Sequence, residues 1–219
     1  MKIPELTEPR FQKLALRLAR IGRSRPEVGQ TDIDLVLENL IGRSLLCLPL
    51  LAQNRPLVDI GAGVGIPGLV LALARPELPV ILLEPRSSCH GIIRWLLKEL
   101  PPLEQLKLVE AKLRDFDFED FPPLQATSRA ALDWPELNKY LPENCGPVIR
   151  WSSPELTPAG SFDPKYLLKI TVTHFNIRQV FTWLGDQEMF HVKQKEWQSN
   201  PNIEINPDPG KADFMDSAD

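Results

Sequence analysis

A short glycine-rich stretch between two apolar segments holds the residues best suited to chemistry. Gly61, Gly63 and Gly65 form a G-x-G-x-G pattern directly after an apolar run, and Glu84 follows a second apolar run at residues 80–83. Glycine lacks a Cβ atom, so the backbone at these positions can turn tightly and approach a ligand closely. A carboxylate at the end of the next strand can accept both hydroxyl protons of a ribose. The pattern therefore predicts a strand, glycine turn, helix and strand that bind a nucleotide-like ligand.

The spacing of the turn and a second acid favour one cofactor class over another. Dinucleotide-binding turns have G-x-G-x-x-G spacing, which seats a pyrophosphate at a helix N-terminus. This chain has a shorter spacing, and Asp59 precedes the turn. S-adenosylmethionine carries positive sulfonium and ammonium groups, so Asp59 and Glu84 suit it better than they suit NAD. The alternative is that the glycines only end a strand in another kind of α/β protein.

Length and composition are those of a soluble globular protein. The chain has 219 residues, of which 43% are hydrophobic and 25% charged. No run approaches the 18 or more apolar residues that a membrane span needs, and residues 1–10 lack the apolar core of a signal peptide. We expect a cytoplasmic monomer without a membrane segment. The three cysteines and three histidines lack metal-ligand spacing, so no metal is expected, and the adjacent Cys89 and His90 are interpreted as packing or surface residues.

The net charge of −4 is unevenly distributed along the chain. Residues 196–219 hold six acidic residues against one lysine, which leaves the rest of the chain slightly positive. Seven basic residues against three acidic ones lie within residues 1–30. A basic face there can contact the phosphates of RNA, and the alternative is an ordinary solvated helix face. The basic residues are Lys2, Arg10, Lys13, Arg17, Arg20, Arg23 and Arg25.

Periodicity divides the chain into three zones. Residues 1–54 have apolar residues at helical spacing and predict an N-terminal helical region. Residues 55–195 alternate apolar strands with helices, which predicts an α/β fold with a doubly wound, mostly parallel seven-stranded sheet whose last strand is antiparallel. Residues 196–219 are rich in Asn, Pro and Asp and predict an acidic disordered tail. The predicted strands are 57–60, 80–83, 106–109, 124–128, 147–151, 168–175 and 188–193, with residues 178–186 connecting the last two.

Several motifs in the same region resemble one known family. Pro67-Gly68 follows the turn, Arg75-Pro76-Glu77 comes soon after, and Thr127-Ser128-Arg129-Ala130 ends the fourth predicted strand. Together with the glycine turn, these motifs resemble the bacterial 16S ribosomal RNA guanine-N7 methyltransferases, also called glucose-inhibited division protein B. The resemblance covers about residues 55–151. It implies a class I methyltransferase fold, S-adenosylmethionine as methyl donor, and a guanine in the decoding region of small-subunit (16S) ribosomal RNA as acceptor.

The resemblance also assigns roles to residues by position. It places Gly61 and Ile66 beside the methionine and adenosine parts of the cofactor and Glu84 on the ribose. Leu113 and Arg114 match the pair that brackets the adenine, although Leu113 also suits an ordinary core position. Taken with the turn and its acid, the predicted cofactor-binding residues are Asp59, Gly61, Gly63, Gly65, Ile66, Glu84, Leu113, Arg114 and Arg129.

Arg129 is the predicted catalytic residue. Amino-group methylation of bases uses an Asn/Asp-Pro-Pro-aromatic loop after the fourth strand, and carbon-5 methylation uses a cysteine nucleophile there. This chain has Ser-Arg-Ala at that point. Guanine N7 already presents a lone pair, so transfer requires alignment rather than a base, and Arg129 can hold the guanine O6 or a phosphate. The alternative for Arg129 is an ion pair with Asp115 or Asp117.

The chain departs from the family pattern at four places. The family commonly has His-x-x-Asp-Ser before the first strand, where an ungapped comparison places Ile41-Gly42-Arg43-Ser44-Leu45. A basic pair is replaced by Ser88-Cys89, a Lys-Gly by Ser152-Ser153, and an acid by Arg114. Two alternative functions therefore stand beside the methyltransferase: a noncatalytic RNA- or ribosome-binding protein of the same fold, and a methyltransferase for a small molecule.

Overall fold

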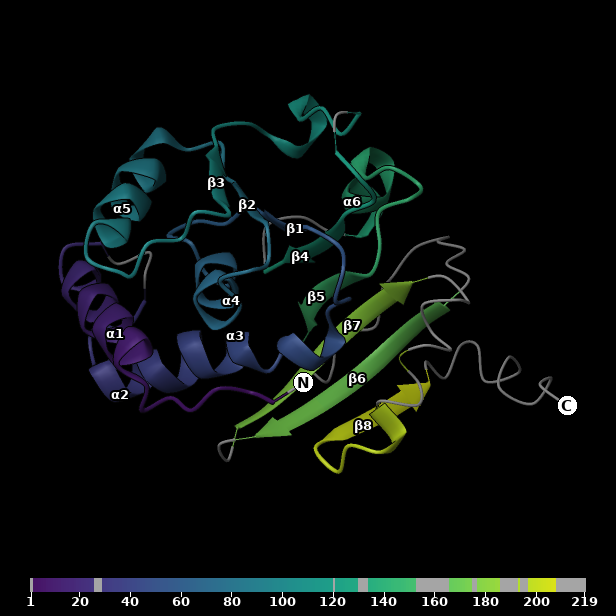
Figure 1. Ribbon diagram of the computed structural model, residues 1–219, viewed down its shortest axis with the longest axis horizontal. Coiled ribbons are helices and arrows are strands. Elements are labelled where there is room, and N and C mark those ends of the chain that lie inside the picture. Colours follow the sequence, from purple (N-terminus) through teal and green to yellow (C-terminus); the bar gives the residue numbers. More distant parts are fainter. Residues whose placement is uncertain are drawn as a thin grey trace, which may run out of the picture.

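An eight-stranded mixed sheet organises the molecule (Figure 1). The computed structural model describes residues 2–25, 29–119, 121–129, 134–152, 166–174, 177–185, 193 and 197–207. The strand order is β3-β2-β1-β4-β5-β7-β6-β8. The strands are β1 (Leu57–Ile60), β2 (Val80–Leu83), β3 (Leu106–Val109), β4 (Gln125–Ser128), β5 (Val148–Ser152), β6 (Tyr166–His174), β7 (Ile177–Gly185) and β8 (Ile203–Pro207).

The strands that lie nearest the glycine turn are parallel and central in the sheet. β1 pairs in parallel with β2 on one side and with β4 on the other, so Ile60 lies level with Leu83 and Ser128. All residues of β1, β2 and β4 are buried, which explains the nearly continuous apolar sequences of β1 and β2. β4 buries polar residues instead, of which Gln125 bonds to the backbone of Ala52. The carboxyl ends of the three strands therefore meet at one edge of the sheet, where the connections turn in opposite directions. Ligands of doubly wound folds bind at that edge.

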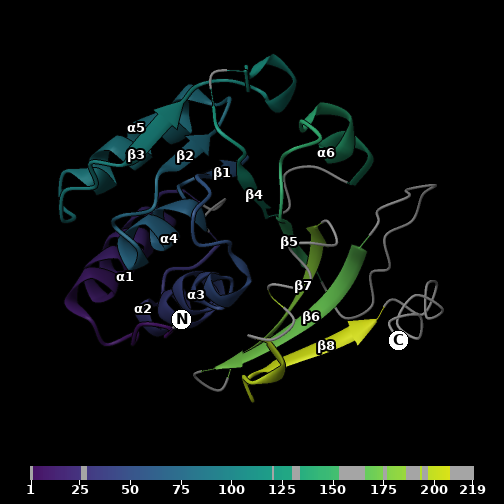
Figure 2. The same cartoon turned by 45° about the vertical axis from the view of Figure 1, so that its right-hand side comes forward.

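Helices cover the sheet on two faces (Figure 2). One face carries α1 (Pro9–Gly22), α4 (Gly68–Ala74) and α5 (Ser87–Leu97). The same face carries a series of short helices that lies between α1 and β1 in the sequence. That series consists of α2 (Ile33–Val36), the π-helix η2 (Leu37–Gly42), α3 (Arg43–Leu45) and the 3₁₀ turn η3 (Leu48–Leu50). The other face carries the 3₁₀ turn η4 (Leu113–Asp115) and α6 (Trp134–Tyr140).

The N-terminal helices share one hydrophobic core with the sheet. Proline at the first turn begins α1, and its apolar stripe of Phe11, Leu14 and Leu18 is completely buried. These side chains belong to the same core cluster as Leu57 of β1 and Leu82 of β2. The helical run before β1 thus positions its residues rigidly against the carboxyl edge of the sheet.

The predicted α/β fold and its five parallel strands are confirmed, whereas the predicted end of the sheet needs correction. Residues 178–186, expected as a connection, lie almost entirely in β7, which pairs antiparallel with β5 and β6. The expected strand 188–193 lies outside the described residues except for Lys193, which is helical. Phe181 is buried against Trp151 of β5, a contact between distant segments that periodicity does not reveal.

β8 corrects the prediction of a disordered tail for residues 203–207. This strand pairs antiparallel with β6 and makes the sheet eight-stranded instead of seven-stranded. Ile203 and Ile205 pack against the core on either side of the exposed Glu204, so the segment alternates as a half-buried edge strand. The Asn, Pro and Asp composition around it hid this short pattern. Residues 208–219 of the predicted tail lie outside the described residues.

No helix in the described part of the chain has the length and apolar character that crossing a membrane requires.

Trp197 provides a test of how the C-terminal segment is anchored. Its side chain is only 1% exposed, and its indole nitrogen donates to the Pro49 carbonyl oxygen at 3.3 Å. We expect Trp197→Ala to lower the free energy of unfolding by about 3–5 kcal/mol, as truncation of buried aromatic side chains does, in urea titrations. Leu16→Ala, at a position 54% exposed on α1, is the control and should change it by less than about 0.5 kcal/mol. Equal effects of the two substitutions would contradict the packing.

Candidate functional site

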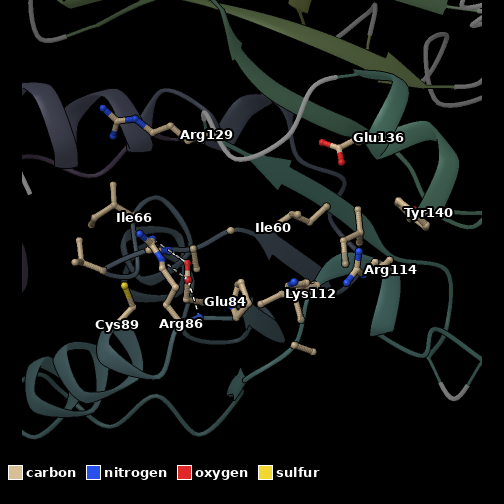
Figure 3. Close-up of a pocket in the computed structure, with 18 of the residues that line it drawn as sticks. Ile60, Ile66, Glu84, Arg86, Cys89, Lys112, Arg114, Arg129, Glu136 and Tyr140 are labelled. Atoms are coloured by element: carbon tan, nitrogen blue, oxygen red, sulfur yellow. Dashed lines mark hydrogen bonds and ion pairs between the residues drawn. The ribbon is translucent and has the colours of Figure 1, made fainter. Parts of the chain in front are cut away.

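A cavity of about 870 Å³ opens at the carboxyl ends of β1, β2 and β4 (Figure 3). Its volume lies within the range of sites that bind cofactors and small molecules. Ile60 and Leu83, the last residues of β1 and β2, form part of its wall, and Arg129 follows the last residue of β4. Seven of the nine predicted cofactor-binding residues line it: Gly61, Gly63, Ile66, Glu84, Leu113, Arg114 and Arg129.

The glycine turn brings backbone amides to the floor of the cavity. The amides of Gly61 and Ala62 donate to the Leu83 carbonyl oxygen at 2.8 and 3.1 Å, which fixes the turn against the end of β2. Gly63 has φ +60°, a left-handed conformation that glycine adopts without strain, and its amide donates to Glu84 Oε2 at 2.8 Å. The turn and the acid after β2 are thus directly connected.

Glu84 is a buried carboxylate held by an arginine two residues later. Its side chain is 2% exposed, whereas that of Arg86 is 61% exposed. The Arg86 amide and Nε donate to Oε1 at 2.9 and 2.7 Å, and Nη2 lies 3.3 Å from Oε2. Burial alone would raise the pKa of Glu84, but these bonds and that from Gly63 hold the pKa below its usual range. The group is therefore an ionised acceptor whose two oxygens already have donors.

Asp59 lies behind the turn, outside the cavity lining. Its side chain is completely buried, and Oδ2 accepts from the Gly68 amide at 2.7 Å while Oδ1 accepts from Thr127 Oγ1 at 3.2 Å. A Cβ atom on Gly68 would lie 2.3 Å from a Leu82 methyl group and 2.7 Å from Asp59 Oδ2, so this close approach requires glycine. The interpretation of Asp59 as a ligand for a cationic cofactor is corrected: Asp59 joins the start of α4 to β4. Gly65, with φ +95°, also lies outside the lining and shapes the turn.

Arg129 extends along the cavity rim toward the N-terminal helices and away from Glu136 (Figure 3). Its Nη2 donates to the Asn39 carbonyl oxygen at 3.2 Å, and its buried Nη1 has no hydrogen-bond partner. Burial lowers the pKa of Arg129, and the nearby charge of Arg43 lowers it further. The alternative of an ion pair with Asp115 does not occur in the described structure, where Asp115 Oδ1 lies 3.6 Å from Arg114 Nε. Ala130 of the Ser-Arg-Ala motif lies outside the described residues.

The adenine-bracketing pair predicted by resemblance has two different environments. Leu113 is buried and also lines the cavity, so it occupies a core position, while its place beside an adenine stays a prediction. Arg114 is largely exposed at the cavity mouth. The sequence analysis missed four polar residues of the lining. They are Arg86, Lys112, Glu136 and Tyr140. The position of Arg86, two residues after Glu84, was a signal in the sequence that could have identified it. Glu136 and Tyr140 lie on α6, a helix that no sequence motif predicted.

Cys89 and His90 lie beneath the cavity wall. Cys89 is buried and lines the cavity. His90 is buried, and its Nε2 lies 2.7 Å from the Glu84 carbonyl oxygen. His90 therefore packs under the strand end, as the sequence interpretation expected. Within the described residues no three His, Cys, Asp or Glu side chains gather as a metal site would require.

The predicted basic face of α1 is partly used within the fold. Arg10 bonds to the Leu73 carbonyl oxygen and pairs with Glu8, and Arg17 Nη2 lies 2.6 Å from Glu99 Oε2. These two arginines hold α1 to its neighbours. Such pairing favours the interpretation of this stretch as an ordinary helix face over a phosphate-binding one.

Comparison with known proteins identifies similar sequences. A protein-family model described as rRNA small subunit methyltransferase G matches residues 7–145. The ribosomal RNA small subunit methyltransferase G of Anaeromyxobacter is 34% identical over 128 residues, which cover 58% of this chain and 59% of that protein. That of Desulfotalea psychrophila is 37% identical over 102 residues, covering 45% and 46%. The chain spans less than two thirds of the length of the curated relatives it matches.

A solved structure supports the fold. The structure of MtNAS in complex with MTA and tNA aligns with 80% of this chain and 71% of that chain, with a TM-score of 0.51 and 12% sequence identity. At this identity the likeness concerns the fold alone. It agrees with the doubly wound α/β sheet.

The buried Asp59 makes stability depend on pH. Burial raises its pKa to about 7, although the bonds from Gly68 and Thr127 oppose the rise. The folded state therefore keeps this proton up to a higher pH than the unfolded state does, and the free energy of unfolding falls as pH rises from about 4 to about 7. In Asp59→Asn the amide oxygen can accept from Gly68 and the amide nitrogen can donate to Thr127 Oγ1. We expect this substitution to remove on the order of 4 kcal/mol of the fall in the free energy of unfolding between pH 4 and pH 7, measured by urea titrations.

Asp117→Asn, at an exposed site, is the matched control and should leave the pH profile unchanged. A profile that is the same for wild type and Asp59→Asn would show that folding does not raise the pKa of Asp59.

Proposed function

The chain belongs to the rRNA small subunit methyltransferase G family, and we propose that it transfers a methyl group from S-adenosylmethionine to N7 of a guanine in small-subunit (16S) ribosomal RNA. The observation that carries the proposal is the convergence of the glycine turn, Glu84 and Arg129 on one cavity at the carboxyl edge of the sheet. We also propose that the protein acts as a monomer in the cytoplasm, where its RNA substrate is assembled into subunits.

The residues of the cavity fit S-adenosylmethionine. An ionised Glu84 at the end of β2 suits a ribose diol, and the backbone at Gly61 and Gly63 leaves room for the amino-acid part of the cofactor. Leu113 provides an apolar surface for an adenine ring, with Arg114 at its edge. When bound, S-adenosylmethionine supplies an electrophilic methyl group.

The remaining task of this chain is to align the acceptor. Guanine N7 has a lone pair that needs no deprotonation, so a general base is unnecessary. Arg129 lies at the cavity rim, with Nη2 bonded to a backbone oxygen and Nη1 unpartnered. A planar guanidinium can hold the guanine O6 or a phosphate and thereby orient N7 toward the methyl group.

One observation favours a second function, RNA binding without methyl transfer. The Arg86 side chain donates to both oxygens of Glu84, so a ribose must displace this guanidinium to bond the carboxylate. Such competition weakens cofactor binding, since the two partners share the same acceptors. The second candidate is therefore a ribosomal RNA-binding protein in which Arg86 permanently occupies the ribose site.

Cofactor binding to the purified chain separates these two functions. We expect Glu84→Ala to weaken binding of S-adenosylmethionine by on the order of 1–3 kcal/mol in calorimetry, the range for a charge-assisted hydrogen bond. Arg86→Ala should strengthen binding, because the carboxylate is then available. Arg94→Ala, an exposed position on α5, is the control and should change nothing. Cofactor binding that is undetectable in wild type and appears only in Arg86→Ala would favour the second function.

Methyl transfer tests the proposed role of Arg129. We expect Arg129→Ala to bind the cofactor with little loss but to transfer labelled methyl to small ribosomal subunits at least tenfold more slowly, because misalignment by ~1 Å can cost ~100-fold. Arg129→Lys should restore only part of the rate, since an ammonium lacks the planar fork. Single-turnover transfer at saturating cofactor is the measurement. Wild type that binds cofactor and subunits without transfer would refute the enzyme, and equal rates in all three would refute the role of Arg129.

A further inference from the structure

Two arginines on different elements share one asparagine beside the cavity. Arg43, at the start of α3, donates from Nε to the Asn39 side-chain oxygen at 3.2 Å and from Nη1 to Gln179 Oε1 at 2.9 Å. Arg129, just after β4, donates to the Asn39 backbone oxygen at 3.2 Å. All of these acceptors are neutral. Within the described residues, neither guanidinium forms an ion pair with a carboxylate.

The arrangement leaves positive charge uncompensated in a half-buried place. Both side chains are partly buried, and Arg129 Nη1 is shielded from solvent without a hydrogen-bond partner. The charge of Arg43 lowers the pKa of Arg129, so the two cations repel each other. The charge of Asp59 acts in the opposite direction, but its effect on the pKa of Arg129 is smaller than that of Arg43. Such a pair costs free energy in the empty protein, and an anion between the two groups would recover it.

The local fold holds Arg43 beside Arg129, which lines the cavity, although Arg43 itself lies outside the lining. Asn39 lies in the π-helix η2, and its neighbour Leu40 lines the cavity together with Arg129. π-Helical turns are rare and are frequently found at functional sites. Gln179 of β7 is buried and receives Arg43 from the other side. Two segments, η2 and β7, therefore fix the direction of the Arg43 side chain.

We propose that Arg43 and Arg129 together form a binding site for a phosphate group, namely the phosphodiester next to the guanine whose N7 enters the cavity. Two guanidinium forks match the oxygens of a phosphate better than ammonium groups do. Arg43 lies in the segment where the family commonly has His-x-x-Asp-Ser. The proposal rests on the proposed function for its RNA strand, but its test does not depend on methyl transfer.

Salt dependence of RNA binding tests the site. The probe is a fluorescein-labelled fragment of 16S ribosomal RNA that contains the decoding region, bound to the full chain without cofactor and followed by anisotropy over a series of KCl concentrations. Each lost phosphate contact lowers the slope of log affinity against log salt by about 0.7–0.9. We expect Arg43→Gln to lower the slope by this amount and the affinity at low salt by on the order of tenfold. Arg94→Gln makes the same charge change on α5 and should leave both values unchanged.

A second variant and a second probe complete the experiment. Arg43→Lys keeps the charge and should keep the slope of wild type while losing part of the affinity, which a loss of folding would not imitate. The second probe is inorganic phosphate. If the site also binds a free anion, the unfolding temperature of wild type should be higher in phosphate than in chloride at equal ionic strength. A slope equal in wild type and Arg43→Gln overturns the proposal, whether or not free phosphate stabilises the protein.

The outcomes also separate this site from the proposed function. If the salt slope of RNA binding falls in Arg43→Gln but wild type transfers no methyl group, the phosphate site is supported and the proposed methyltransferase activity is refuted. Methyl transfer by wild type with an unchanged slope in Arg43→Gln retains the enzyme and refutes the phosphate site.

Discussion

The buried carboxyl group of Asp59 is the interaction on which the geometry of the cavity depends. It joins β1, which carries it, to the Gly68 amide at the start of α4 and to Thr127 of β4. These three elements surround the glycine turn, so their relative positions determine where the turn and Arg129 lie. A hydrogen-bonded group inside a nearly dry interior specifies one arrangement strongly, because any other would leave a buried polar atom without a partner. The raised pKa of Asp59 is the electrostatic cost of this arrangement.

Glu84 shows the opposite result of burial. Its carboxylate is as inaccessible as that of Asp59, yet its pKa is lowered, because the Arg86 guanidinium and two backbone amides donate to it. One acid therefore serves the fold, and the other remains an ionised acceptor at the cavity. The two acids of the sequence motif, which composition alone treats alike, differ in the number and charge of their donors.

The sequence predicted the part of the molecule in which local pattern and tertiary environment agree. The five parallel strands, the glycine turn and the placement of Glu84 and Arg129 at one edge follow from apolar runs and topology, and the family resemblance is confirmed by the match over residues 7–145. β7 and β8 could not be predicted in the same way, since they depend on pairing with strands distant in sequence. The role of Asp59 was also hidden, because a sequence does not state which way a side chain on a buried strand faces.

The structure shows where the residues that depart from the family pattern lie and what they contact. Where the family commonly has His-x-x-Asp-Ser, this chain has a π-helical segment followed by Arg43, and the arginine reaches the same asparagine as Arg129. Where the basic pair is missing after Glu84, Arg86 supplies a cation directly on the carboxylate. A cavity that keeps both a ribose-type acceptor and cations beside it retains what binding of a nucleoside cofactor and of a phosphate-bearing strand requires.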